Sequence, residues 1–355
     1  MRAGIVYFTD KGKATCQRIV EALKKQDFQC EIRDKNEPLK EWAKRAFEEM
    51  DAVVFVSATG IAVRTIAPLL KSKAEDPAVI VTDDNGIYVI SLVSGHIGGA
   101  NELAVKLAEE TEGIPVITTS TDINNKFAVD KWAVDNGLVI KNINRVSDVS
   151  MTLVNEGVVG IYGDMKLSVK DPQIKLYVKE EDKIETNIGI NISWHKKNRF
   201  AKELRLLPKW LTIGIGCRKN TSCQTIEKVV SEVLDEFDID KEAIVKVASI
   251  DIKKEEKGLI EFSQKNNWPF ETYSAEKLKS AKGEFPPSSF VEKITGVDNV
   301  CQRAAVIGAT YQQSSDEASS QAAENQIHGR IIVEKQSKNG VTVAIAAKEA
   351  ELNVQ

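Results

Sequence analysis

Short, continuously apolar segments alternate with amphipathic segments through the first 125 residues, and this alternation restricts the fold more than any other feature. A short segment rich in valine and isoleucine is typical of a strand that is buried on both faces. Apolar residues at helical spacing are typical of a helix that covers such a sheet. Strands are predicted at residues 4–8, 28–32 and 52–56, and helices at residues 14–25 and 39–47.

This order of elements predicts an N-terminal, mostly parallel α/β sandwich with helices on both faces of its sheet. Ligands of such folds bind at the carboxyl ends of the strands. We therefore expect a site at one edge of the sheet, formed by the loops that follow the strands. The candidate loops are residues 9–13, 57–64, 94–101 and 118–122.

A glycine-rich corner joins a predicted strand, residues 87–93, to a predicted helix that begins at Ala100. The N-terminus of a helix carries unpaired N–H groups and a partial positive charge, and glycine lets a ligand approach the backbone closely. Such a corner can hold an anion or a developing oxyanion. It contains His96, one of only three histidines in the chain.

The residues of this corner also have purely structural explanations. Gly98 and Gly99 can simply form the turn, Glu102 can take part in capping the helix, and Asn101 can face water. No lysine follows the glycines. The corner therefore matches neither a dinucleotide fingerprint nor a phosphate-binding loop of the Gly-Lys-Ser/Thr type.

Two further regions follow Asp122. Helices at residues 127–135 and 146–155, with short strands among charged runs, predict a small α+β middle domain that ends in a basic run. That run, residues 194–209, is predicted to be a solvated strand or linker, with a basic wall for a polycarboxylate ligand as the alternative. The segment from Leu211 predicts a second α/β domain. The predicted domains are residues 1–125, 126–209 and 210–355.

The predicted C-terminal domain contains a second glycine corner at residues 214–216, followed by Cys217 and Arg218. These two residues resemble an anion-contacting corner more than a nucleophile, because no histidine lies between residues 196 and 327 to activate the thiol. Residues 312–326 are rich in Ser, Ala, Gln and Glu and predict a surface loop.

The bulk composition is that of an ordinary globular protein, with 42% hydrophobic and 28% charged residues. The net charge of −4 argues against a broad nucleic-acid surface. No apolar run suggests a signal peptide or a membrane span, so a cytoplasmic protein is expected. The five cysteines form no C-x-x-C pair, which suggests neither a disulfide framework nor a zinc site.

Several motifs, in order along most of the chain, resemble the cobalt-precorrin-5A hydrolase family of anaerobic cobalamin biosynthesis. The N-terminal motifs are the segments 57–70, 91–104 and 115–122. The C-terminal motifs are the segments 214–218, 248–251, 273–276, 296–301 and 340–346. The resemblance implies an enzyme that opens a δ-lactone in a cobalt tetrapyrrole and releases acetaldehyde.

Such chemistry needs a base and donors for an oxyanion. With the resemblance, this need favours His96 as the base, the N–H groups of Gly98 and Gly99 as oxyanion donors, and Glu102 or Asp122 as the orienting partner of His96. Arg64 is suited to grip a substrate carboxylate, or it can form a structural salt bridge with Asp83 or Glu102. The residues expected to bind substrate are Thr59, Gly60, Arg64, Ser94, Gly95, Gly98, Gly99, Asn101, Gly216, Cys217 and Arg218.

The resemblance also implies that cobalt enters with the substrate, so that no separate metal or cofactor is required. The segment from Leu211 onward is similar to a small protein of the aerobic cobalamin route, which has different chemistry. We therefore expect the catalytic groups before about residue 125, and macrocycle binding or homodimer formation in the C-terminal part. Two rival functions stay open, a flavodoxin-like FMN-binding module and a non-catalytic tetrapyrrole carrier.

Overall fold

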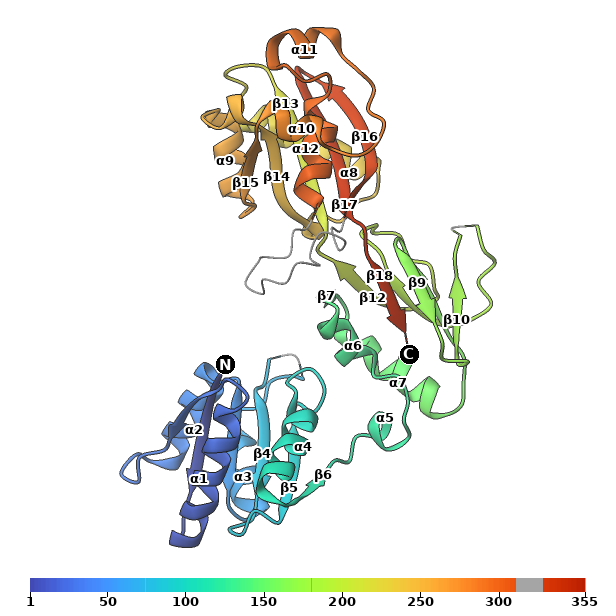
Figure 1. Ribbon diagram of the computed structural model, residues 1–355. Helices are drawn as coiled ribbons and strands as arrows, with labels where there is room; N and C mark the ends of the chain where they lie inside the picture. Colours follow the sequence, from blue (N-terminus) through green and yellow to red (C-terminus); the bar gives the residue numbers. More distant parts are fainter. Residues whose placement is uncertain (74, 180, 311–327, 355) are drawn as a thin grey trace, which may run out of the picture. The chain divides into compact units, whose positions relative to one another are not determined.

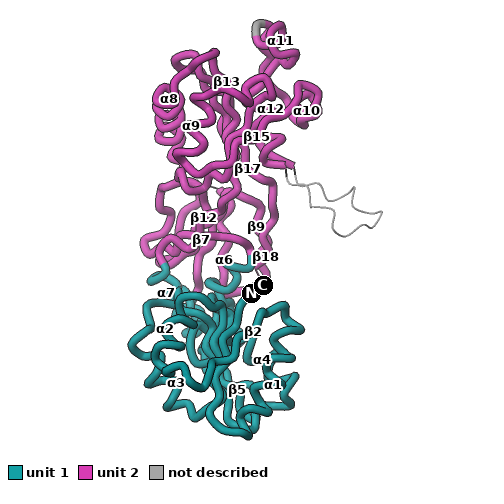
Figure 2. The backbone as a smooth tube through the Cα atoms, turned by 90° about the vertical axis from the view of Figure 1, so that its left-hand side faces the viewer, with its two compact units in different colours: residues 1–135, 143–157 teal, residues 136–142, 158–355 magenta. Residues whose placement is uncertain are grey.

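The computed structural model describes residues 1–73, 75–179, 181–310 and 328–354. The chain forms two compact units, coloured separately in Figure 2. Unit 1 comprises residues 1–135 and 143–157, and unit 2 comprises residues 136–142 and 158–355. The division into three domains at residues 125 and 209 stays a prediction, although each of the three predicted segments contains one large sheet.

Unit 1 is built on a six-stranded sheet with the order β2-β1-β3-β4-β5-β6 (Figure 1). Every residue of β3 and β4 is buried, as their continuous apolar sequences predict. Helices α1 and α4 pack on one face of the sheet, and α2 and α3 pack on the other. The strands are β1 (Arg2–Tyr7), β2 (Gln29–Ile32), β3 (Ala52–Val56), β4 (Ala78–Thr82), β5 (Tyr88–Val93) and β6 (Ile114–Val116). The helices are α1 (Asp10–Lys24), α2 (Leu39–Glu49), α3 (Thr59–Ile66) and α4 (Ala100–Thr111).

The direction of β5 overturns the expectation that the candidate loops share one edge. β5 runs antiparallel to β4, with Thr82 opposite Val89 and Val79 opposite Val93, and β6 runs parallel to β5. The loops after β5 and β6 therefore lie at the edge opposite to the loops after β1 and β3. The cause is a tight turn in which Asp83 accepts hydrogen bonds from the N–H groups of Asn85 and Tyr88, both at 2.8 Å, and Gly86 has φ +76°.

The remaining helices of unit 1 follow the sheet and carry part of the site described below. The first one begins directly after the loop that follows β6. They are α5 (Ser120–Ile123), α6 (Val129–Asp135), η1 (Ile143–Arg145) and α7 (Val146–Val154).

Unit 2 begins with a five-stranded sheet of order β10-β8-β11-β12-β7, parallel except for β7. The predicted basic linker contains β12, which lies between two strands of this sheet, and most of β12 is buried. The prediction of a solvated strand or linker was wrong for this part, because Leu204, Leu206 and Leu207 are buried in the core. The strands are β7 (Leu138–Ile140), β8 (Val159–Gly163), β10 (Ile174–Tyr177), β11 (Ile188–Ile192) and β12 (Lys202–Pro208).

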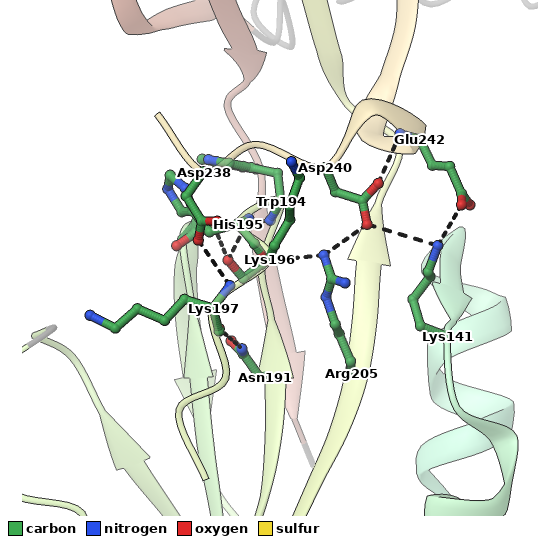
Figure 3. A network of polar contacts seen from close by, with 12 residues as sticks. Lys141, Asn191, Trp194, His195, Lys196, Lys197, Arg205, Asp238, Asp240 and Glu242 are labelled. Carbon is green, nitrogen blue, oxygen red and sulfur yellow. Dashed lines mark hydrogen bonds and ion pairs between the residues drawn. The ribbon is translucent and has the colours of Figure 1, made fainter. Parts of the chain in front are cut away.

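Two basic side chains of this run, Lys196 and Arg205, are held by acidic groups of the following segment, residues 235–242; Figure 3 shows the contact of Arg205 with Asp240. Arg205 donates to the Asp240 carboxylate at 2.9 Å and to the carbonyl oxygen of His195 at 3.0 Å. Lys196 forms an ion pair with Asp235 at 2.9 Å. These contacts hold the segment against residues 235–242 of unit 2. Because the charges of Lys196 and Arg205 are already paired with carboxylates, the alternative of a basic wall for a ligand is weakened.

The second large sheet of unit 2 has the order β15-β14-β13-β17-β16, with β13, β14 and β15 parallel and β16 and β17 antiparallel. A two-stranded parallel pair joins β18 to β9. The strands are β9 (Lys166–Val169), β13 (Leu211–Cys217), β14 (Ile244–Ile250), β15 (Phe270–Tyr273), β16 (Gly329–Lys338), β17 (Val341–Lys348) and β18 (Glu351–Val354). The helices are α8 (Cys223–Glu236), η2 (Lys241–Ala243), η3 (Asp251–Lys253), α9 (Lys257–Lys265), α10 (Ala275–Lys279), α11 (Ser289–Thr295) and α12 (Val300–Ala309).

The second glycine corner predicted from the sequence does not exist, because Gly214 and Gly216 lie inside β13. A Cβ atom on Gly214 would lie 1.8 Å from the carbonyl oxygen of Cys301, in α12. Glycine is therefore needed here for close packing of a helix on the strand and not for a turn. The predicted loop at residues 312–326 lies outside the described residues. The α/β class predicted for the chain is confirmed.

Candidate active site

His96 lies between two aspartates of unit 1. Its Nε2 atom is 2.8 Å from Oδ2 of Asp122, and its Nδ1 atom is 3.0 Å from Oδ1 of Asp130. The hydroxyl of Thr121 lies 3.2 Å from Nε2. The side chain of Asp122 is 37% exposed and that of Asp130 only 7%. Asp122 is thus the more exposed of the two carboxylates, and Asp130 is the buried one.

Asn101 fixes the position of Asp122. Its amide nitrogen donates to Oδ2 of Asp122 at 2.9 Å and to the hydroxyl of Thr119 at 3.0 Å. Its amide oxygen accepts a hydrogen bond from Ser91 at 2.6 Å. The alternative in which Asn101 only faces water is wrong, because the residue is buried. Two polar groups, the imidazole of His96 and the amide of Asn101, thus orient one oxygen of Asp122 and leave the other oxygen for a further partner.

The two aspartates control the charge of His96. The hydrogen bond to Asp130 raises the pKa of His96, with a smaller contribution from Asp122, and this outweighs the opposing effect of burial. Burial disfavours the charged form of Asp130, but its hydrogen bond with His96 nevertheless holds the pKa of that carboxyl below its ordinary value. A histidine that faces a carboxylate at each ring nitrogen donates both N–H groups. The arrangement therefore favours the protonated imidazolium form of His96. In this form His96 is a proton donor, and it can act as a base only after it has lost that proton.

The glycine corner shapes the loop around His96. Gly99 has φ +79°, a conformation that favours glycine, and its N–H donates to the carbonyl oxygen of His96 at 3.0 Å. That N–H is therefore engaged and does not serve as the predicted oxyanion donor in this conformation. At Gly98 a Cβ atom would lie 2.5 Å from Cβ of Ser94, and at Gly95 it would lie 2.6 Å from Oδ1 of Asn101. Ser94 itself is buried and donates to the carbonyl oxygen of Asp76 at 2.9 Å.

His96 and Asp130 open onto a pocket of about 590 Å³ that belongs entirely to unit 1. The segment from Thr119 to Thr121 forms its polar side, and Val146, Met151 and Val154 contribute an apolar wall. A pocket with an apolar wall and a few convergent polar groups is the usual form of a small-molecule site.

Of the two carboxylates proposed as partners of His96, Asp122 makes the contact. Glu102 is exposed and pairs with Lys106 at 2.8 Å and with Lys131 at 3.8 Å. Glu102 is therefore held in surface ion pairs, and the N–H of Gly99 that a capping role would engage donates to the carbonyl oxygen of His96 instead.

Thr59, Gly60 and Arg64 lie at the other edge of the sheet, after β3, and the structure does not bring them together with His96. Arg64 is in the last turn of α3, and it donates to the carbonyl oxygen of Gly60 at 3.3 Å. Its predicted salt bridges to Asp83 or Glu102 are not among the ion pairs of the described residues. Substrate binding at this edge stays a prediction.

Gly216, Cys217 and Arg218 lie at the end of β13 in unit 2. Burial raises the pKa of the Cys217 thiol, which keeps it protonated at neutral pH. This agrees with the prediction that Cys217 is not a nucleophile. Arg218 is exposed, and its role in binding substrate stays a prediction.

Asp130 is the residue of this candidate site that the sequence did not predict. It lies in the first turn of α6, a helix that was predicted, but no local motif connects it with His96, which is 34 residues earlier. Asp122 and Thr121, by contrast, belong to a segment that carries the family resemblance. In the described part of the chain, no group of three or more His, Cys, Asp or Glu side chains could hold a metal ion.

Comparison with known proteins identifies the family of this chain. Three family models match consecutive parts of the chain: "Cobalamin synthesis G N-terminal" at residues 41–122, "Cobalamin biosynthesis central region" at 127–208 and "Cobalamin synthesis G C-terminus" at 211–346. The cobalt-precorrin-5A hydrolase of Salmonella typhimurium is 35% identical over 271 residues, which cover 74% of this chain and 77% of that protein. The chain belongs to the cobalt-precorrin-5A hydrolase family.

Two other relatives carry the family name. The cobalt-precorrin-5A hydrolase of Priestia megaterium is 34% identical over 74% of this chain and 73% of its own length. A protein of Methanocaldococcus jannaschii named as a probable cobalt-precorrin-5A hydrolase is 27% identical over 98% of this chain and 99% of its own. The chain is thus an enzyme of cobalamin biosynthesis, and the family does not favour an FMN-binding module or a non-catalytic carrier. Among the described residues, no helix is both long and apolar enough to cross a membrane.

Proposed function

We propose that this chain hydrolyses cobalt-precorrin-5A, opening its δ-lactone and releasing acetaldehyde to give cobalt-precorrin-5B, and that the reaction takes place at His96. The observation that carries the proposal is the placement of His96 between Asp122 and Asp130 at the wall of a pocket of about 590 Å³. The family assignment supports the substrate. The paired histidine and carboxylates supply the proton transfers that both steps need.

In the first step, water adds to the lactone carbonyl. Asp122 takes one proton from this water, because its second oxygen is free of the contacts to His96 and Asn101 that hold the first. The ring C–O bond then breaks, and the His96 imidazolium gives its proton to the departing alkoxide. The raised pKa of His96 favours the protonated form that this step requires. Asp122 passes its proton to solvent through its exposed side.

In the second step, the neutral imidazole acts as the base predicted from the sequence. It takes the proton of the new hydroxyl group, and the O–H electrons form the carbonyl of acetaldehyde. The adjacent C–C bond breaks, and its electron pair moves into the macrocycle, which later takes up a proton from solvent. His96 returns to its charged form, and Asp130 holds the ring in place through both steps.

Cobalt is part of the substrate in this proposal, and the chain requires no cofactor of its own. The family of biosynthetic enzymes supports action in the cytoplasm. The C-terminal part would contribute binding of the macrocycle or formation of a homodimer. All the groups assigned to proton transfer lie in unit 1.

Anaerobic incubation with cobalt-precorrin-5A tests the proposal, with mass spectrometry of the corrin product and trapping of acetaldehyde. We expect acetaldehyde and cobalt-precorrin-5B in equal amounts from the wild-type protein. His96→Gln should lower the rate by about 10²- to 10⁴-fold, the usual contribution of a general acid or base. The matched control Glu102→Gln removes a carboxylate from the same corner and should keep most of the activity. Full activity of His96→Gln would contradict the proposal.

A further inference from the structure

A second pocket, in unit 2, has no part in the proposed proton transfers. Its volume is about 360 Å³, and it lies beside β14 and β15, the short helix α10 and the end of α12. Three lysines from separate positions of the chain line it, namely Lys246, Lys277 and Lys282. Val306 and Ile307 contribute apolar surface.

The acidic group of this pocket is already fully engaged. Lys246 pairs with one oxygen of Glu271 at 2.7 Å. The other oxygen of Glu271 accepts a hydrogen bond from the Tyr273 hydroxyl at 2.5 Å. Burial, together with the neighbouring Glu271, raises the pKa of Tyr273, so the phenol stays protonated and keeps donating. The charges of Lys246 and Glu271 therefore compensate each other. The hydrogen bond from Tyr273 holds the Glu271 carboxylate in position.

Lys277 and Lys282 supply the remaining charge. Neither forms an ion pair with a carboxylate among the residues that the structure describes. The contact of Lys282 is instead with Nε2 of His328 at 3.0 Å. An imidazole carries no negative charge and does not compensate the ammonium charge. The lining of the pocket therefore has an excess of positive charge next to apolar surface.

We infer that this pocket binds organic carboxylates, with Lys277 and Lys282 as the cationic groups. A singly charged carboxylate attached to a carbon skeleton suits two ammonium groups beside Val306 and Ile307. A compact phosphate would place more negative charge near Glu271 and would leave the apolar surface without a partner. The carboxylate can come from a side chain of the tetrapyrrole or from a free small acid. Binding of a tetrapyrrole carboxylate rests on the proposed function, whereas binding of a free small acid does not.

The test is isothermal titration of the full-length protein with defined probes. Dicyanocobyrinic acid presents carboxylates on a cobalt corrin, its methyl ester presents the same ring without them, and succinate represents a free acid. The variant is Lys277→Gln combined with Lys282→Gln. The matched control is Lys279→Gln, which removes the same charge from the same helix but does not line the pocket. Melting temperatures of all variants confirm that they fold.

If tetrapyrrole carboxylates bind here, the double variant should raise the Kd of dicyanocobyrinic acid about tenfold, the loss expected for charged hydrogen bonds. Lys279→Gln should have no effect, and the Kd of the methyl ester should be unchanged in both variants. If a free acid binds, the variant should instead lose succinate binding while corrin binding stays the same. Unchanged Kd values for both acids, or tighter binding of inorganic phosphate than of succinate, would overturn the inference. Acetaldehyde release by the wild-type protein is measured separately, so failure of the proposed function is distinguishable.

Discussion

The loop before α4 in unit 1 and the end of β13 in unit 2 have similar sequences but different structures. Both contain closely spaced glycines beside apolar residues, and the sequence of each predicted an anion-binding corner. In unit 1, Gly99 adopts φ +79° and the chain turns into a helix beside His96. In unit 2, Gly214 and Gly216 remain in the strand, and Gly214 accommodates the backbone of α12.

This difference separates two physical uses of glycine. The first use is a backbone conformation that other residues adopt at a cost, and the second is the absence of a side chain where two backbones meet. Only the first use creates a loop that can present polar groups to a ligand. The chemistry follows the same division, because two carboxylates raise the pKa of His96 and favour its charged form, whereas burial raises the pKa of Cys217 and favours the neutral thiol.

The largest expected effect concerns Asp122. Asp122→Asn keeps the shape of the side chain but removes the charge that accepts a proton from water, so the rate of acetaldehyde release should fall about 10²- to 10⁴-fold. Cys217→Ser in unit 2 should change the rate by less than about threefold, because a neutral buried thiol is not a nucleophile. Steady-state rates under anaerobic conditions give both values. A greater loss with Cys217→Ser would move the chemistry to unit 2.

The next effect is on stability and compares the two glycines directly. Gly214→Ala places a Cβ atom 1.8 Å from the carbonyl oxygen of Cys301 and should lower the free energy of unfolding by about 3 kcal/mol or more, as severe overpacking does. Gly99→Ala meets no atom within 4 Å and should cost only about 1 kcal/mol, through its positive φ. Denaturant unfolding of both variants measures the difference. The reverse order of costs would show that the two glycine roles are assigned wrongly.

A smaller effect is expected for the two arginines that were predicted to bind substrate carboxylates. Arg64→Ala and Arg218→Ala should each raise KM by up to about tenfold at nearly constant kcat if they bind substrate. Initial rates over a range of substrate concentrations separate the two parameters. An unchanged KM for Arg64→Ala alone would confine substrate binding in unit 1 to the edge that carries His96.

The smallest effect is the pH dependence of stability. Because the folded-state pKa of His96 is raised, its ion pairs stabilise the protein fully below the unfolded pKa of about 6.5, and this contribution is lost as pH rises through the folded pKa. The difference in melting temperature between wild type and His96→Gln should therefore shrink from pH 5 to pH 9. Cys217→Ser should show no such trend below pH 8. A difference that grows with pH would show that His96 is neutral in the folded protein.

The sequence predicted those features that depend on local patterns. The continuously apolar segments located β3, and the spacing of apolar residues located α1, α2 and α4 within a few residues. His96 and Asp122 could be named because both lie in segments that resemble a known family. The resemblance could not distinguish Asp122 from Glu102, because that choice depends on how α4, which carries Glu102, and α5, which carries Asp122, are placed around His96.

The remaining features depend on contacts between distant residues. The reversal of β5 follows from the turn at Asp83 to Gly86, a turn signal that also suits an antiparallel pair, and it separates Arg64 from His96. Asp130 reaches His96 only because α6 folds back on the sheet domain, and no spacing along the chain encodes that contact. The role of Gly214 required knowledge of α12, which lies many residues later.

Residues 136–142 belong to unit 2 although they lie between two segments of unit 1 in the sequence, and this order matters during synthesis on the ribosome. β7 pairs with β12, with Ile140 opposite Leu206, so its partner is translated only after the last segment of unit 1, residues 143–157. Unit 1 can close while Leu138, Val139 and Ile140 still form an unpaired apolar strand. Such an edge can pair with a strand of another nascent chain. Slow translation between residues 157 and 208 would lengthen this exposure and favour aggregation of the unfinished protein.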